Sequence, residues 1–207
     1  MKKILSVLLS MMLICYCAFA EEAAEDAITS ATLKITKLPE VETQDNGILV
    51  VYFSPDDTTR AAAYAIAAGL HAGLFEIEAE EPYTEDDLNY FNNAARSMRE
   101  MRDPKARPAI AALPENLEKY DTILLGYPVW GGKAAKIMLT FLESVDLSGK
   151  TVIPFCTSNS SPFGSSDADM KKIAGDSVIW KKGTRIVKGA TAEEIIEQAK
   201  EILNPEE

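Results

Sequence analysis

Three short apolar runs constrain the fold of this chain more than any other feature. They are Ile48–Phe53, Thr122–Tyr127 and Thr151–Cys156. A continuous apolar run is typical of a strand that is covered on both faces. Helical patterns separate the runs, so the sequence predicts an α/β fold in which helices cover both faces of a doubly wound parallel sheet. Leu74–Glu78 alternates apolar and acidic residues, which predicts a further strand near a sheet edge.

The predicted helices carry apolar residues three and four positions apart. Thr191 and Glu194 form a capping box that predicts the start of the last helix. The apolar stripes are Ala62, Ala65, Ile66, Gly69 and Leu70, then Ala134, Ile137, Met138, Phe141 and Leu142, and finally Ile195, Ile196, Ala199 and Leu203.

Two further segments are less regular. Thr84 followed by Asp87 resembles a capping pair, and predicts a helix that runs to about Arg102, before Asp103-Pro104 breaks it. A short helix is expected after Ser166. Pro154 lies inside the third apolar run, where a proline is awkward for an interior position of a sheet.

The first twenty residues have the pattern of a cleaved secretory signal. A basic start at Lys2 and Lys3 precedes an apolar run that ends in Ala18-Phe19-Ala20. We therefore expect an exported protein, periplasmic or secreted, with no stable membrane anchor after cleavage. Residues 21–46 are acidic and rich in Ala and Thr, without a sustained period, and are expected to be a disordered tether. The domain itself is expected over residues 47–205.

Composition excludes several function classes. The net charge is −11 and becomes −13 once Lys2 and Lys3 leave with the signal, so the chain has no basic surplus for nucleic acid. Cys156 is the one cysteine of the expected mature chain, which leaves no disulfide and no C-x-x-C motif. We expect it to be a buried strand thiol. Glu76, Glu78, Glu80 and Glu81 are expected to form a solvated face rather than a metal site.

A parallel sheet of this kind binds ligands outside the carboxyl ends of its strands. Three segments leave those ends, Ser54–Thr59, Pro128–Gly132 and Thr157–Gly164. A hydrolase is disfavoured, because the single histidine, His71, lies at the far end of the first helix and no G-x-S-x-G motif is present. The topology therefore predicts a binding site made by these three loops.

Six segments carry a resemblance to a known family: ILVVYFS (48–54), LFEIEAEEPYTEDDLNY (74–90), RPAI (107–110), YDTILLGYPVWGG (120–132), TFLESVDLSGKTVIPFCTS (140–158) and GSSDADMKKIA (164–174). In these segments the chain resembles the flavodoxins, in particular secreted or short-chain bacterial proteins with a flavodoxin-like FMN domain. The resemblance implies a five-stranded sheet in the order 2-1-3-4-5, FMN as cofactor, and electron transfer.

Each ligand loop departs from the family pattern. Where the family has S-x-T-G-x-T around the phosphate, Asp56 and Asp57 replace the middle Thr and the Gly. An aspartate there can occupy the amides at the helix start and repel a phosphate, and Arg60 can offset part of this charge. In the third loop, Asn159 and Pro162 replace glycines; proline cannot adopt positive φ.

The second loop reads Trp130-Gly131-Gly132 where the resembling group has Trp-Trp-Gly. Trp130 can be a platform for the flat flavin ring or a packing residue only. The two glycines permit the peptide flip that flavodoxins use on reduction, or form a plain turn.

The resemblance implies a set of cofactor-binding residues in the three loops, with the phosphate near Ser54, Thr58 and Thr59. Two functions stay open: an FMN-binding electron carrier or small flavin reductase outside the cytoplasm, with a basic redox partner, or a flavodoxin-fold module with weak or no flavin binding that acts as a scaffold. The implied site residues are Ser54, Thr58, Thr59, Pro128, Val129, Trp130, Gly131, Gly132, Thr157, Ser158, Asn159, Ser160 and Gly164.

Overall fold

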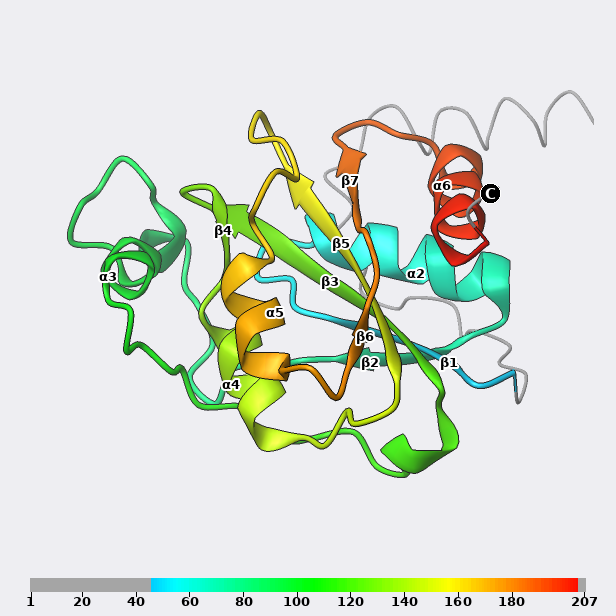
Figure 1. The fold of residues 1–207 in the computed structure, drawn as a ribbon. Coiled ribbons are helices and arrows are strands. Elements are labelled where there is room, and N and C mark those ends of the chain that lie inside the picture. Colours follow the sequence, from blue (N-terminus) through cyan, green and yellow to red (C-terminus); the bar gives the residue numbers. More distant parts are fainter. Residues whose placement is uncertain (1–45, 205–207) are drawn as a thin grey trace, which may run out of the picture. The chain divides into compact units, whose positions relative to one another are not determined.

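The structure is a computed structural model and describes residues 46–204. The expected signal over residues 1–20 lies outside the described residues, and so does the expected tether over 21–46 apart from its last residue. The described part forms one sheet with helices on both faces, as predicted (Figure 1). Its strands are β1 Ile48–Tyr52, β2 Gly73–Glu76, β3 Thr122–Trp130, β4 Lys133–Ala134, β5 Thr151–Ser158, β6 Ile179–Trp180 and β7 Thr184–Val187.

The strand order confirms the expected topology, although the count of five strands is wrong. The sheet runs β2-β1-β3-β5-β6, all parallel, with β2 at the edge. The position after β5 is filled by two short strands, β6 and β7, which pair with different parts of β5. β4 adds a short antiparallel pair with the end of β3. If the parallel strands are counted along the chain without β4, their order is the expected 2-1-3-4-5, and the fifth strand is divided into β6 and β7.

The division of the fifth strand explains how β5 accommodates Pro154. The carbonyl of Val152 accepts the N–H of Lys181 at 2.9 Å on the β6 side, and backbone groups two residues apart in a strand point to the same side. Residues 181–183 lie between β6 and β7, opposite Pro154. In a parallel ladder the next bond would run from the N–H of residue 154 to the carbonyl of Lys181. Proline has no N–H, so the pairing of β5 with β6 ends here, and pairing with β7 begins at Phe155.

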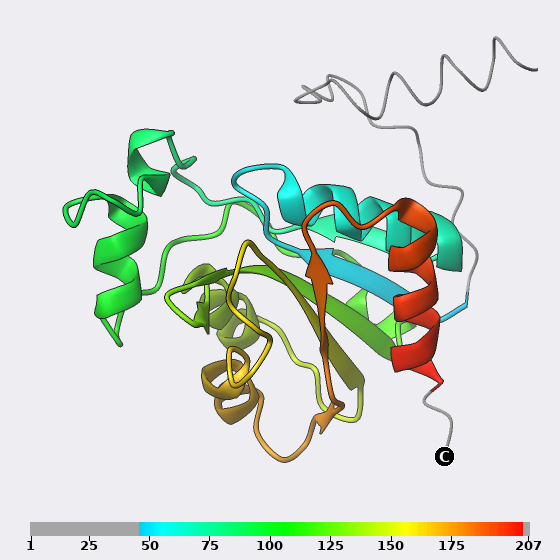
Figure 2. The same ribbon diagram turned by 90° about the horizontal axis from the view of Figure 1, so that it is seen from above.

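Helices cover the sheet on two faces (Figure 2). On one face, α2 Thr58–Leu70 and α6 Ala192–Leu203 pack over β1, β3 and β5, and a Cβ on Gly69 would lie 2.5 Å from Ile196 Cγ1, so these helices approach closely. On the other face lie α4 Ile137–Ser144 and α5 Ala168–Ala174. The predicted capping box of Thr191 and Glu194 is confirmed. Ala134 was expected on a helix but lies in β4, since α4 begins only at Ile137.

The helix predicted from Thr84 to Arg102 is wrong in its extent. Thr84 and Asp87 do exchange hydrogen bonds as a capping pair, but only the short turn η1 Asp86–Leu88 follows, and α3 Arg96–Arg102 starts later. The side chains of Asn89 and Asn92 accept backbone N–H groups two residues ahead, from Phe91 and Ala94. Such local bonds compete with the helical backbone pattern and end it.

The remaining short element is η2 Leu117–Lys119. Figures 1 and 2 both show α3 at one end of the sheet, beyond β4. Within residues 46–204, no helix is long and apolar enough to cross a membrane.

Candidate functional site

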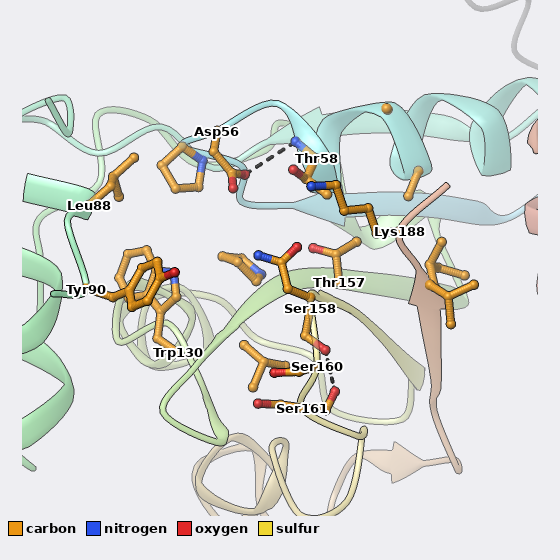
Figure 3. A pocket seen from close by; sticks show the side chains of 18 of the residues that line it. Asp56, Thr58, Leu88, Tyr90, Trp130, Thr157, Ser158, Ser160, Ser161 and Lys188 are labelled. Atoms are coloured by element: carbon orange, nitrogen blue, oxygen red, sulfur yellow. Dashed lines mark hydrogen bonds between the residues drawn. The ribbon is translucent and has the colours of Figure 1, made fainter. Parts of the chain in front are cut away.

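A cavity of about 590 Å³ opens at the carboxyl ends of the strands, where the topology predicts the site. Its volume lies within the range of about 300–1,000 Å³ that is usual for small-molecule and cofactor sites. Figure 3 shows Trp130, Tyr90 and Leu88 at one end of the cavity, and Thr58, Thr157 and Lys188 toward the other. The predicted site residues that line it are Thr58, Pro128, Val129, Trp130, Gly131, Thr157, Ser158, Asn159 and Ser160.

Four predicted site residues do not line the cavity. Ser54 is buried behind the first loop, where its Oγ accepts the N–H of Arg60 at 2.9 Å. Thr59 is also buried, and its Oγ1 is 2.7 Å from Oγ1 of Thr157, a bond that joins α2 to β5. Gly132 and Gly164 lie in turns with positive φ. These four residues belong to the three loops but do not line the cavity, and their contact with a ligand stays a prediction.

The first loop has a left-handed residue at its centre, just before α2. Asp57 adopts the left-handed conformation, φ 63°, at the position where the family has glycine. Asp56 turns its carboxylate to the start of α2, and its Oδ1 accepts the N–H of Thr58 at 3.3 Å (Figure 3). The predicted competition is thus present at Thr58. No hydrogen-bond partner is found within residues 46–204 for the N–H of Thr59, so this donor at the helix start stays free.

The charge of Arg60 is already used within the protein. Its guanidinium pairs with Asp57 and with Glu76 on β2, and Glu76 also accepts the phenolic O–H of Tyr52 at 2.8 Å. The hydrogen bond to Glu76 is the main cause that raises the pKa of Arg60, while burial and then Glu76 raise the pKa of Tyr52. Glu76 was expected on a solvated face and is instead half-buried in this network. Arg60 therefore balances Asp57 rather than a ligand.

Trp130 lies in an aromatic cluster at one end of the cavity. Its ring meets those of Phe53 and Tyr83 edge-on, with centroids 6.0 and 5.6 Å away. The Oη of Tyr83 donates to Glu100 of α3 at 2.6 Å. These edge contacts hold the indole from the side, so packing and a platform role are both compatible with its place in the cavity wall.

Gly131, next to Trp130, needs its lack of a side chain for two reasons. Its φ is +54°, and a Cβ there would lie 2.0 Å from Sδ of Met101 on α3. A side chain at this position would strain the backbone and would require the side chain of Met101 to move.

The third loop is tied to the split strand beside it. Ser158 Oγ donates to the carbonyl of Ser161, and Arg185 on β7 donates to the same carbonyl, the latter at 3.1 Å. Pro162 follows directly and removes a backbone donor. The positive charge of Arg185, like that of Arg60, is directed at a group of the protein.

Comparison with known proteins agrees with this architecture. The family model described as Flavodoxin matches residues 47–202. The chain belongs to the flavodoxin family. Among solved structures, it is similar to a protein from Bacteroides eggerthii that was assigned as a flavoprotein, with 40% identity over 75% of this chain and 97% of that one and a TM-score of 0.69. A search of curated proteins finds no match.

Two more solved structures are similar. A protein from Bacteroides uniformis, also assigned as a flavoprotein, shares 37% identity over 78% of this chain and 99% of that one, with a TM-score of 0.70. A flavoprotein from Lactobacillus acidophilus in complex with FMN shares 22% identity over 67% of this chain and 91% of that one, with a TM-score of 0.57, and shows likeness of fold.

Sequence reasoning missed part of the wall of this flavodoxin cavity. Leu88 and Tyr90 come from the segment that was expected to be helical, and Lys188 follows β7, a strand that was not predicted. β7 carries β-branched residues at Thr184, Ile186 and Val187, but four residues are too few to show a period. Other unpredicted lining residues are Pro55, Asp56, Ala61, Ala62, Ser97, Met98, Ser161, Ile186, Val187, Gly189, Ala190 and Ile195.

Cys156 is fully buried in β5, as predicted. Burial raises the pKa of its thiol to about 12, so it is neutral at ordinary pH. Within the described part of the chain, no group of three or more His, Cys, Asp or Glu is placed to hold a metal.

Proposed function

We propose that this domain binds one FMN in the cavity and acts as an electron carrier or small flavin reductase. The observation that carries the proposal is the arrangement of the cavity, with an aromatic wall at one end and the start of a 13-residue helix at the other. A helix start favours a phosphate through its free N–H groups and its dipole. An aromatic wall suits a flat conjugated ring.

The residues present fit FMN, with the exception of Asp56 in the phosphate loop. The hydroxyl of Thr58 and the free N–H of Thr59 are suited to the phosphate, Trp130 to the ring, and backbone groups of residues 157–160 to the polar edge of the ring. Asp56 opposes this fit, because its carboxylate already accepts the N–H of Thr58. The aspartate places negative charge where a phosphate would bind.

Bound FMN would supply the electron chemistry. The protein would hold the flavin and set its environment. A net charge of −13 without residues 1–20 opposes the addition of further negative charge in the cavity, and would lower the reduction potential of a bound flavin. The same charge attracts a basic redox partner.

The contact between Asp56 and Thr58 also favours a second candidate function, a flavodoxin-fold scaffold that binds no flavin. The absorption spectrum of the purified protein separates the two. We expect flavin bands in the visible region, bleaching on reduction with dithionite, and release of FMN rather than riboflavin on denaturation. A colourless protein that stays colourless after incubation with FMN and gel filtration would favour the scaffold.

We propose further that the protein is exported and loses residues 1–20. The basic start, the apolar run and the Ala18-Phe19-Ala20 site support this proposal. N-terminal sequencing of the protein from its native cells should begin at Glu21. A mature protein that begins at Met1, or at a lipid-modified cysteine, would contradict the proposal.

A further inference from the structure

The residues that line the cavity include two charged side chains, Asp56 and Lys188. A phosphate monoester carries nearly two negative charges at neutral pH, since its second pKa is about 6. Asp56 repels such a group. The other candidate cations near the loops, Arg60 and Arg185, are directed at Glu76 and at the carbonyl of Ser161. Among the described residues that line the cavity, Lys188 is therefore the one cationic side chain that can balance the charge of the phosphate.

The backbone around Lys188 directs its side chain to the cavity. The N–H of Ala190 donates to the carbonyl of Val187 at 3.1 Å and closes a turn whose third residue, Gly189, has φ +85°. Glycine at that position is typical of a tight turn. Figure 3 shows the lysine pointing from this turn toward Thr58, in the first turn of α2. The turn between β7 and α6 thus brings a positive charge to the helix start.

Lys188 also has no competing ion pair in the described part of the chain. No carboxylate among residues 46–204 lies within ion-pair distance of its ammonium, whereas Lys133 pairs with Asp169 and Arg107 with Glu143. An unpaired lysine in a cavity wall can meet an anionic ligand without first losing a partner.

We propose that Lys188 binds the phosphate of the flavin and makes the cavity select a phosphorylated flavin over an unphosphorylated one. This inference rests on the proposed function. Asp56 and Lys188 act on the phosphate with opposite sign. Lys188 thereby compensates for the aspartate that replaced the family's threonine in the phosphate loop.

Titration of the flavin-free protein with FMN and with riboflavin tests the inference. Lys188→Gln removes the charge, Lys188→Arg keeps it, and Lys182→Gln is the matched control, an exposed lysine on the same segment that does not line the cavity. We expect Lys188→Gln to weaken FMN binding about tenfold, to change riboflavin binding less than about twofold, and to reduce the salt dependence of FMN binding. Lys188→Arg and Lys182→Gln should bind FMN nearly as the unaltered protein does.

The outcomes separate this inference from the proposed function. If the unaltered protein binds FMN, and Lys188→Gln loses no more affinity than Lys182→Gln, the role of Lys188 is wrong while the proposed function stands. Equal losses for FMN and riboflavin would also overturn it, because they would show a structural role. If the unaltered protein binds neither flavin, the proposed function fails and this inference fails with it.

Discussion

Asp56 and Asp57 are neighbours in the phosphate loop, yet they have different roles. Asp57 takes up the left-handed turn that the family gives to glycine, and its charge is balanced by Arg60. Asp56 faces the cavity and accepts the N–H of Thr58. The sequence showed that both residues depart from the family pattern. It could not show which one opposes a phosphate, because that depends on the partner of each carboxylate.

Replacing both aspartates by the family's residues, Asp56→Thr with Asp57→Gly, should raise FMN affinity at least tenfold. One unit charge about 5 Å from the phosphate costs roughly 1 to 3 kcal/mol, which corresponds to roughly 5- to 200-fold in affinity. Most of the gain should come from Asp56→Thr alone, because Arg60 already balances Asp57. Quenching of flavin fluorescence measures the affinity.

Riboflavin is the control for this double variant. Its affinity should change little, since it carries no phosphate. An equal gain for both flavins would show that the loop acts on the ring instead, and no gain for FMN would show that Asp56 does not face the phosphate.

At the scale of elements, strands were predicted better than the segments between them. Apolar runs such as Ile48–Phe53 reveal a strand covered on both faces, and β1, β3 and β5 lie where these runs are. The segment after Thr84 carries a helix start signal, but asparagine side chains end the helix after one turn. Short edge strands such as β6 and β7 leave a weak pattern, because two to four residues are too few for a period.

The segment between β6 and β7, residues 181–183, packs closely against β5 at Gly183. A Cβ at this residue would lie 2.2 Å from the carbonyl oxygen of Pro154 and 2.5 Å from the ring of Phe163. Gly183→Ala should therefore push the split strand from β5 and lower the free energy of unfolding by about 1 to 3 kcal/mol.

Thermal or urea unfolding measures this change, with Lys182→Ala as the control at the adjacent exposed position. We expect Gly183→Ala to lower Tm by several degrees, and Lys182→Ala to leave it nearly unchanged. Equal Tm values for the two variants would contradict the close packing of β5 against residues 181–183.

For the molecule as a whole, the fold was more predictable than the site. Strand pattern, strand order and the family resemblance identified the edge of the sheet where the cavity lies, and nine of the residues that line it. Tyr90 was missed because its segment was expected to be helical, and Lys188 was missed because it follows a strand too short to show a period. Whether such residues reach the cavity depends on the paths of the segments before α3 and after β7. Those paths are set by packing against the rest of the fold, and no local sequence pattern shows them.

Two buried side chains that can lose a proton, a tyrosine and a cysteine, make the stability of the molecule sensitive to alkaline pH. Tyr127 and Cys156 are both 0% exposed, and burial raises the pKa of the thiol to about 12 and that of the phenol above its usual value. In the unfolded chain, the thiol of Cys156 loses its proton near pH 8.5 and the phenol of Tyr127 near pH 10. Because the folded state then binds more protons than the unfolded state, the free energy of unfolding falls as pH rises.

Urea unfolding between about pH 8 and about pH 11 should show this decline, with a loss of about 1 kcal/mol per group for each pH unit above its unfolded pKa. Tyr127→Phe removes one of the groups and should make the decline shallower. A constant free energy of unfolding over this range would contradict the burial of these protons.

Calorimetric titration of the flavin-free protein with FMN, and separately with riboflavin, tests the central claim most directly. The account predicts saturable one-to-one binding of FMN and weaker binding of riboflavin, because the ring would meet the aromatic wall in both cases while only FMN reaches the start of α2. Absence of saturable FMN binding would contradict the account and would favour a flavodoxin fold that serves as a scaffold.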